Sequence, residues 1–221
     1  MNLAGFVPLS LCDYPGRVAA VVFTQGCNFR CPWCHNGHLL PMTSDPATRV
    51  DEACVLAVLA ERCTRLGGVV VTGGEPTLQA DLPRFLKRLK ALGLDVKLDT
   101  NGSHPDVLRR LLDERLVDYL AMDMKAPWDK YATLTGVACD VAAMQASLKL
   151  IAASGLPHAF RTTRVDPLLS KLDYDQLAAQ VPEGSPHTWQ LFRPAYSRDP
   201  ALRAMAPFAV HQVSQEAKDG R

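Results

Sequence analysis

Short apolar runs alternate along the chain with longer stretches in which apolar residues recur every three or four positions. A short apolar run is typical of a buried strand, and the three-to-four spacing is typical of a helix with one buried face. The runs predict strands at residues 18–24, 69–72, 95–99, 117–122, 159–165 and 187–192. The periodic stretches predict helices at residues 52–66, 82–92, 105–114, 140–153 and 174–180.

Alternating strands and helices predict an α/β fold with a mostly parallel sheet and the helices outside it. Right-handed crossovers curl such a sheet toward a barrel, but the six predicted units are too few to close one. We therefore expect a partial (β/α)6 barrel. It forms a single domain over residues 1–221, with a core at about 10–194, a polar connector at 42–50 and a C-terminal tail at about 208–221 that frays.

The chain has 221 residues, enough for one sizeable core, and its formal net charge of +1 gives no reason to expect a nucleic-acid partner. No apolar run is long enough to span a bilayer, and the first residues lack the charged-then-apolar layout of a signal peptide. We therefore expect a cytoplasmic protein without a membrane partner. In that compartment, seven cysteines favour metal or redox chemistry over disulfide bonds.

Polar residues follow the ends of the predicted strands. Parallel α/β sheets bind ligands at the carboxyl ends of their strands, so we expect these residues to share one rim. In chain order they are Cys27, Cys31 and Cys34, the Gly-Gly-Glu-Pro turn at 73–76, and Asp99, Asn101, Asp123, Lys125, Arg161, Arg164 and Gln190. Such clustering is harder to obtain by chance than any single motif.

The three cysteines lie in one loop, residues 24–36, which we name the cysteine loop. Closed zinc and iron–sulfur sites usually take four protein ligands, whereas three ligands leave a coordination position open for chemistry. We interpret the loop as the site of a [4Fe–4S] cluster with one free iron. The alternative is a zinc site with His35 or His38 as fourth ligand. Adjacent Cys34 and His35 would have difficulty binding one ion together, but His38 meets no such objection.

The turn at 73–76 suits a ligand site beside the cysteine loop. Its two glycines let backbone approach a ligand closely, and Glu75 supplies a carboxylate that can hold an ammonium group. Pro76 stiffens the turn. The alternative is a plain strand-to-helix turn, and the motif becomes specific only in combination with the cysteine loop.

With these motifs the chain resembles the radical S-adenosylmethionine superfamily over about residues 10–194. The resemblance implies that the three cysteines hold the cluster and that its free iron chelates S-adenosylmethionine. One electron then cleaves this cofactor to methionine and a 5′-deoxyadenosyl radical. By the same resemblance Gly74 and Glu75 meet the amino group of the cofactor. Trp33 borders its adenine, with a core or lid tryptophan as the alternative.

Three segments resemble more closely the activating enzymes of glycyl radical enzymes, above all those assigned to anaerobic, class III ribonucleotide reductase. They are residues 10–16 (Ser-Leu-Cys-Asp-Tyr-Pro-Gly), 23–27 (Phe-Thr-Gln-Gly-Cys) and 31–36 (Cys-Pro-Trp-Cys-His-Asn). The Asp-x-Lys pair formed by Asp123 and Lys125 matches the same enzymes. The resemblance implies that Lys125 pairs with the cofactor carboxylate and Asp123 with a polar edge nearby.

The resemblance suggests further contacts with the cofactor. Asp99 and Asn101 are candidates for its ribose or amino-acid part, and Gln190 for another polar contact, although a cap on the sixth strand explains Gln190 equally well. His35 either hydrogen-bonds near the cluster or is a loop histidine that faces water. The remaining cysteines are interpreted as ordinary thiols: Cys12, Cys54, Cys63 and Cys139.

The implied function is hydrogen abstraction from a glycine of an anaerobic ribonucleoside-triphosphate reductase. The implied partners are that reductase and a low-potential electron donor such as flavodoxin or ferredoxin. Three alternatives stay open. The chain could activate another glycyl radical enzyme, act on a small molecule as 7-carboxy-7-deazaguanine synthase does, or serve as a metal-binding interaction module.

Overall fold

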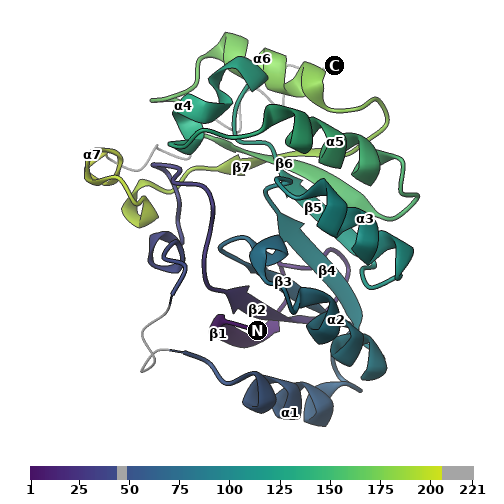
Figure 1. Ribbon diagram of the computed structural model, residues 1–221. Helices are drawn as coiled ribbons and strands as arrows, with labels where there is room; N and C mark the ends of the chain where they lie inside the picture. The colour runs from purple at the N-terminus through teal and green to yellow at the C-terminus, as the bar shows by residue number, and fades with distance from the viewer. Residues whose placement is uncertain (44–48, 206–221) are drawn as a thin grey trace.

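The computed structural model describes residues 1–43 and 49–205, so the predicted tail at 208–221 and most of the connector at 42–50 lie outside it. The described chain forms one sheet whose strands follow the chain order from β1 to β7 (Figure 1). The strands are β1 (Leu3–Ser10), β2 (Ala19–Thr24), β3 (Gly68–Gly73), β4 (Asp95–Thr100), β5 (Tyr119–Asp123), β6 (His158–Arg164) and β7 (His187–Leu191). Strands β2 to β7 run parallel, which confirms the predicted mostly parallel sheet.

Helices follow the outer side of the curved sheet, with α2, α3 and α5 in a row (Figure 1). The longer helices are α1 (Glu52–Arg62), α2 (Leu82–Ala91), α3 (Pro105–Asp113), α5 (Val141–Ala152) and α6 (Lys171–Gln180). The short elements are α4 (Tyr131–Thr135), α7 (Pro200–Arg203) and the 3-10 turns η1 (Gly37–Leu39), η2 (Pro76–Leu78), η3 (Trp128–Lys130) and η4 (Pro194–Tyr196). Between sheet and helices lies the core, where Phe85, Leu89 and Leu98 are fully buried. No described helix combines the length and the apolar character that crossing a membrane requires.

Local capping signals set the starts of the helices. The Asp51 carboxylate accepts hydrogen bonds from two backbone N–H groups in the first turn of α1. Ser170 and Asp173 form a capping box, so α6 begins at Lys171 rather than at the predicted residue 174. The polar residues of that first turn carry a capping signal and no apolar periodicity, which is why the pattern alone placed the start too late.

The N-terminal strand β1 is an element that the sequence pattern did not predict. Its segment contains Gly5 and Pro8, which both disfavour strands, and its antiparallel register with β2 is irregular between Val7 and Ser10. Gly5 lies opposite Phe23, whose ring would come within 3.3 Å of a Cβ atom at that position. The small residue therefore makes room for the ring, and pairing with β2 overrides a weak local preference.

The sheet is open, as expected of a partial barrel. Among the strands of the described residues β1 pairs only with β2 and β7 only with β6, so the two edge strands do not meet. The carboxyl ends of β2 to β7 therefore form a rim that is not sealed on the side between the edges.

Candidate active site

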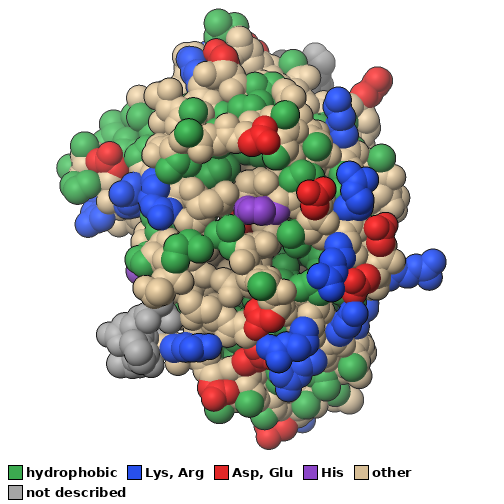
Figure 2. Space-filling model, viewed as in Figure 1, with side chains coloured by type: hydrophobic (Ala, Val, Ile, Leu, Met, Phe, Trp, Pro, Cys, Tyr) green, Lys and Arg blue, Asp and Glu red, His purple; other side chains and the backbone are tan. Residues whose placement is uncertain are grey.

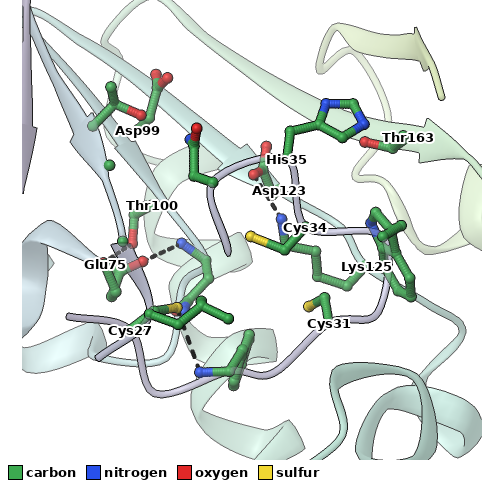
Figure 3. Close-up of a pocket in the computed structure, with 18 of the residues that line it drawn as sticks. Cys27, Cys31, Cys34, His35, Glu75, Asp99, Thr100, Asp123, Lys125 and Thr163 are labelled. Carbon is green, nitrogen blue, oxygen red and sulfur yellow. Dashed lines mark hydrogen bonds and ion pairs between the residues drawn. The ribbon is translucent and has the colours of Figure 1, made fainter. Parts of the chain in front are cut away.

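A cavity of about 230 Å³ opens at the carboxyl ends of the parallel strands (Figure 3). All the residues that the sequence assigned to the cluster or the cofactor line it: Cys27, Cys31, Trp33, Cys34, His35, Gly74, Glu75, Asp99, Asn101, Asp123, Lys125 and Gln190. The remaining lining residues are Phe29, Asn36, Leu40, Thr72, Gly73, Thr100, Arg161 and Thr163. The fold thus brings the candidate site together at the rim where α/β sheets bind ligands.

Backbone hydrogen bonds join the start of the cysteine loop to residues 39 and 40, just after its end. The Gly26 N–H donates to the Leu39 carbonyl at 2.8 Å, and the Cys27 N–H donates to the Leu40 carbonyl at 3.2 Å. The chain that follows the cysteine loop therefore returns to the start of the loop. In Figure 3 the sulfur atoms of the three cysteines face a common space.

The chemistry of these thiols fits a thiolate-ligated cluster. All three are free, and the Phe29 N–H donates to Cys27 Sγ at 3.4 Å, as a donor to a thiolate would. Burial raises the pKa of Cys27, and raises that of Cys31 to about 12. A thiolate in this cavity consequently needs a cationic centre beside it, and three sulfur donors on one loop, two of them buried, suit an iron–sulfur cluster.

The histidines considered as a fourth zinc ligand have other surroundings. His35 Nε2 accepts a hydrogen bond from the Arg193 N–H at 3.4 Å, and its ring stacks on Phe192 with 6.0 Å between centroids. His38 is exposed and does not belong to the cavity wall. Among the described residues, no three Cys, His, Asp or Glu side chains are placed to hold one metal ion. His38, an alternative fourth ligand, therefore lies apart from the cavity that the three cysteines line.

The glycine pair after β3 approaches protein backbone. A Cβ atom on Gly74 would lie 2.0 Å from the Gly26 carbonyl oxygen, and Gly73 has a φ of +122°. The Glu75 N–H donates to that same carbonyl of Gly26 at 2.8 Å. The close approach that the sequence analysis assigned to a ligand is thus an approach to the cysteine loop, whereas contact of Gly74 with a cofactor stays a prediction.

Glu75 is a buried carboxylate that accepts four hydrogen bonds. Its Oε1 accepts from the Thr77 N–H at 3.1 Å, from the Thr77 hydroxyl at 2.5 Å and from the Thr100 hydroxyl at 2.8 Å. Its Oε2 accepts from the Asn101 N–H at 2.7 Å. Burial raises the pKa of Glu75, and these donors oppose the shift. The side chain thereby ties the turn after β3 to the end of β4.

An amide pair links the cysteine loop to the turn after β4. The Asn101 side-chain amide donates to Asn28 Oδ1 at 2.8 Å, and the Asn28 amide donates to the Ser103 hydroxyl at 2.9 Å. Asn101 Oδ1 accepts from the Ser103 N–H at 3.0 Å. Both the amide nitrogen and the amide oxygen of the Asn101 side chain are therefore hydrogen-bonded within the protein. The sequence analysis missed Asn28 as a partner in this network.

Five charged side chains form a continuous chain across β4, β5 and β6. Arg161 lies at its centre, with Nη1 3.1 Å from Asp99 Oδ2 and Nη2 2.8 Å from Asp123 Oδ1. At one end Lys125 Nζ donates to Asp123 Oδ2 at 2.8 Å, and at the other end Lys97 pairs with Asp99. Three cations and two carboxylates leave this chain of side chains with one positive charge in excess, although Lys97 does not line the cavity.

These groups hold one another in the charged state. Burial opposes ionisation of Asp123, but Arg161 and Lys125 together hold the pKa of its carboxyl group far below the ordinary range. Against the same desolvation, Asp123 raises the pKa of Lys125 and of Arg161. Both cations and the carboxylate therefore stay ionised around neutral pH.

Sequence reasoning missed Lys97 and did not choose between Arg161 and Arg164. Lys97 stands two residues before Asp99 in a buried strand, so both side chains lie on one face of β4, and that alternation was the available signal. Arg161 lines the cavity. Arg164 has a side chain that is 50% exposed and lies over the Tyr174 ring, as expected of a surface arginine.

Trp33 and Gln190 differ in exposure although both line the cavity. Trp33 is 4% exposed and belongs to the main core cluster, so a packing role and a ligand contact are compatible. Gln190 is exposed on the edge strand β7 and therefore stands at the open side of the site.

Comparison with known proteins gives consistent family matches. A family model described as the radical SAM superfamily matches residues 21–179. A provisionally named glycyl-radical enzyme activating enzyme of Methanocaldococcus jannaschii is 32% identical over 210 residues, which cover 92% of this chain and 85% of that protein. The 7-carboxy-7-deazaguanine synthase of Synechocystis sp. is 40% identical over 42% of each chain. The pyruvate formate-lyase-activating enzyme of Staphylococcus epidermidis is 33% identical over 56% of this chain and 53% of that enzyme.

Solved structures share the fold at low sequence identity. Coproporphyrinogen III oxidase from Escherichia coli, described as a radical SAM enzyme, superposes with a TM-score of 0.59 at 16% identity, over 88% of this chain and 49% of that chain. SuiB of Streptococcus suis bound to S-adenosylmethionine gives a TM-score of 0.61 at 15% identity, over 79% of this chain and 40% of that chain. The chain spans less than half of either protein, and the likeness concerns the partial barrel alone.

We expect Gly74→Ala to displace the cysteine loop, because its Cβ atom would lie 2.0 Å from the Gly26 carbonyl oxygen. Overpacking of this kind costs about 1–3 kcal/mol of unfolding free energy. Denaturant titration measures that loss, and iron content after anaerobic reconstitution reports the displaced loop. Gly67→Ala is the matched control, since its Cβ atom would meet nothing closer than 3.4 Å. Equal behaviour of the two variants would show that this backbone contact does not position the loop.

We expect Arg161→Gln to lower the free energy of unfolding by about 3 kcal/mol, because two largely buried carboxylates lose their shared cation. Arg164→Gln on the same strand should change it by less than about 0.5 kcal/mol. The pKa of Asp123 is depressed in the folded protein. The ionised carboxylate therefore stabilises the folded state above the pKa of an unfolded aspartate, and this stabilisation is lost as pH falls below that value. Urea titrations from neutral to acidic pH should therefore show a shallower acid-side loss in Arg161→Gln. Matching curves for both variants would contradict the role of the charge chain.

Proposed function

The chain belongs to the radical S-adenosylmethionine superfamily, and we propose that it generates a glycyl radical on an anaerobic ribonucleoside-triphosphate reductase. Membership confirms the predicted enzyme class and the predicted cofactors, a [4Fe–4S] cluster and S-adenosylmethionine. At the family level the chain is an activating enzyme of glycyl radical enzymes, since it matches such a protein over 92% of its own length. The identity of the target enzyme is what we propose beyond that.

Cys27, Cys31 and Cys34 are the residues that would hold the cluster. Their support is the geometry described above, in which three free thiols on one loop line the cavity. When bound, the cluster and S-adenosylmethionine supply the electron and the 5′-deoxyadenosyl radical that hydrogen abstraction needs. The protein positions the reacting groups and keeps other molecules away from the radical, because a radical of this kind reacts with any neighbouring group.

Two oppositely charged surfaces of the cavity suit the amino-acid part of the cofactor. Glu75 is a buried carboxylate, and no cation of the described chain pairs with it, so an ammonium group of the cofactor would complement it. Lys125 lines the cavity and shares its ion-pair partner Asp123 with Arg161, so a carboxylate of the cofactor would complement it. We assign the two ends of the amino-acid moiety accordingly.

The remaining residues divide into those that face the cofactor and those that hold its neighbours. Trp33 lines the cavity with an aromatic face that suits adenine, and His35 and Gln190 border the open side. Asp99 and Asn101 bind Arg161 and Asn28 respectively. We therefore assign Asp99 and Asn101 to positioning these partners beside the cofactor.

The choice of a protein substrate rests on the extent of the sequence match. The match to the activating enzyme covers 92% of the chain, whereas the match to a 7-carboxy-7-deazaguanine synthase covers 42%. The unsealed side between β1 and β7 supports this choice, since a loop of a partner protein can close it. Among glycyl radical enzymes, the three segments at 10–16, 23–27 and 31–36 favour the anaerobic reductase as the target, with flavodoxin or ferredoxin as electron donor.

Paramagnetic resonance tests the target directly. The reconstituted, reduced protein is mixed anaerobically with S-adenosylmethionine and the anaerobic reductase, and we expect a glycyl radical signal together with 5′-deoxyadenosine. Pyruvate formate-lyase and a carboxylated pterin serve as competing substrates. A glycyl signal with pyruvate formate-lyase alone would replace the reductase as target, and turnover of the pterin alone would refute activation of a protein.

We expect Cys31→Ala to abolish cluster assembly and glycyl radical formation, because it removes one of three thiolate ligands. Iron content and the visible absorption of anaerobically reconstituted protein measure the loss. Cys139→Ala is the control, since that thiol contacts the Thr135 hydroxyl at 3.9 Å and does not line the cavity. If Cys31→Ala retained a full cluster, the cysteine loop would not be its binding site.

A further inference from the structure

An arginine-rich surface covers the outer side of the cysteine loop. The segment at 193–203 contains three arginines and one aspartate, and it packs against Arg30 of that loop. Figure 1 shows α7 beside the loop, and Figure 2 shows a group of basic side chains in the same region. We name Arg30, Arg198 and Arg203 the arginine patch; Arg198 and Arg203 are exposed and Arg30 is half-buried.

Backbone carbonyl groups fix the members of the arginine patch. Arg30 Nη1 donates to the carbonyls of Cys27 and Phe29. Arg198 Nη1 donates to the Arg30 carbonyl at 2.9 Å, and Arg203 Nη2 donates to the Arg198 carbonyl at 3.2 Å. The patch is therefore a preformed surface. One hydrogen bond connects it to the carbonyl group of Cys27, which we assign as a cluster ligand.

The segment that carries the patch is fastened to the cysteine loop. The Asp199 N–H and the Ser197 hydroxyl both donate to the Pro32 carbonyl at 2.9 Å. The patch consequently keeps its position relative to the three cysteines. It stays outside the cavity, because none of its arginines belongs to the cavity wall.

The positive charge of the patch is not neutralised by the described chain. The Asp199 carboxylate caps α7 by accepting the Ala201 N–H at 2.7 Å. The ion pairs that arginine forms among the described residues lie elsewhere and involve no member of the patch. Since the whole chain has a formal charge of only +1, this concentration of charge is local. A local basic surface of this kind attracts an acidic partner.

We propose that the arginine patch docks an acidic, one-electron carrier protein that reduces the centre held by the cysteine loop. The proposal rests on the function proposed above, which requires one electron per cleaved cofactor. In this step the reduced carrier loses one electron and the cluster gains it, with no bond made or broken in the protein. Because the arginine patch lies outside the cavity, the carrier can approach the cysteine loop from its outer side while cofactor and substrate occupy the cavity side.

The test compares charge variants of the holoenzyme with one protein donor and one small donor. The variants are Arg198→Gln with Arg203→Gln, and Arg198→Glu with Arg203→Glu; the protein donor is flavodoxin, an acidic flavoprotein. We expect the association rate of flavodoxin to fall by roughly tenfold or more in the Glu pair and less in the Gln pair, with a weaker salt dependence in both. Stopped-flow absorbance gives the reduction rate, and calorimetry with oxidised flavodoxin gives the affinity independently of turnover.

Two controls separate docking from a damaged site. Photoreduced 5-deazariboflavin, which is small and uncharged, should reduce the cluster of all variants at the wild-type rate. Arg109→Glu, an exposed arginine of α3, should leave flavodoxin binding unchanged. Unchanged flavodoxin affinity in the Glu pair would overturn the proposal. So would a loss of glycyl radical formation that persists with 5-deazariboflavin, since the patch would then serve the substrate enzyme. If the wild type, once reduced by 5-deazariboflavin, formed no 5′-deoxyadenosine, the function proposed above would fail instead.

Discussion

The buried carboxylate of Glu75 is the interaction on which the geometry of this site depends. A desolvated carboxylate is costly unless donors surround it, and here the donors come from two places, the turn after β3 and the end of β4. They can meet only if β3 and β4 keep their parallel register, which the sheet provides. Because the Glu75 N–H also binds the Gly26 carbonyl, the same residue holds the cysteine loop against the strand ends. Sheet, turn and loop are thus coupled through one side chain.

The site contains separate acidic and basic surfaces, although the net charge of the whole chain is only +1. The carboxylate of Glu75 and the cationic end of the five-residue chain at Lys125 present opposite signs to one cavity. On the far side of the cysteine loop, the arginine patch presents a third surface, which is predominantly basic. Burial makes the first two strong and specific, since they act in a poorly screened space. The third acts through water and over a longer range, which suits an encounter between proteins.

Much of the fold and most of the site followed from the sequence, for identifiable reasons. Buried parallel strands are apolar and end in polar residues, so the alternation located β2 to β6 and the rim, and the exposed edge strand β7 continued the alternation. Strand β1 was not predicted because Gly5 and Pro8 disfavour strands and because pairing with β2 determines its conformation. Spacing identified the three cysteines, but it could not show that Asn28 bonds to Asn101 or that Arg161 bridges Asp99 and Asp123. Such partners are set by which strand ends become neighbours, and that information is tertiary.

The contact between Gly74 and the Gly26 carbonyl restricts how chains of this kind can diverge. Where two loops touch backbone to backbone, no side chain lies between them to absorb a change, and a shift of one loop is passed in full to the other. An insertion in the cysteine loop would therefore require a compensating change after β3. The two segments lie far apart in the chain, yet a change in the backbone of one requires a matching change in the backbone of the other.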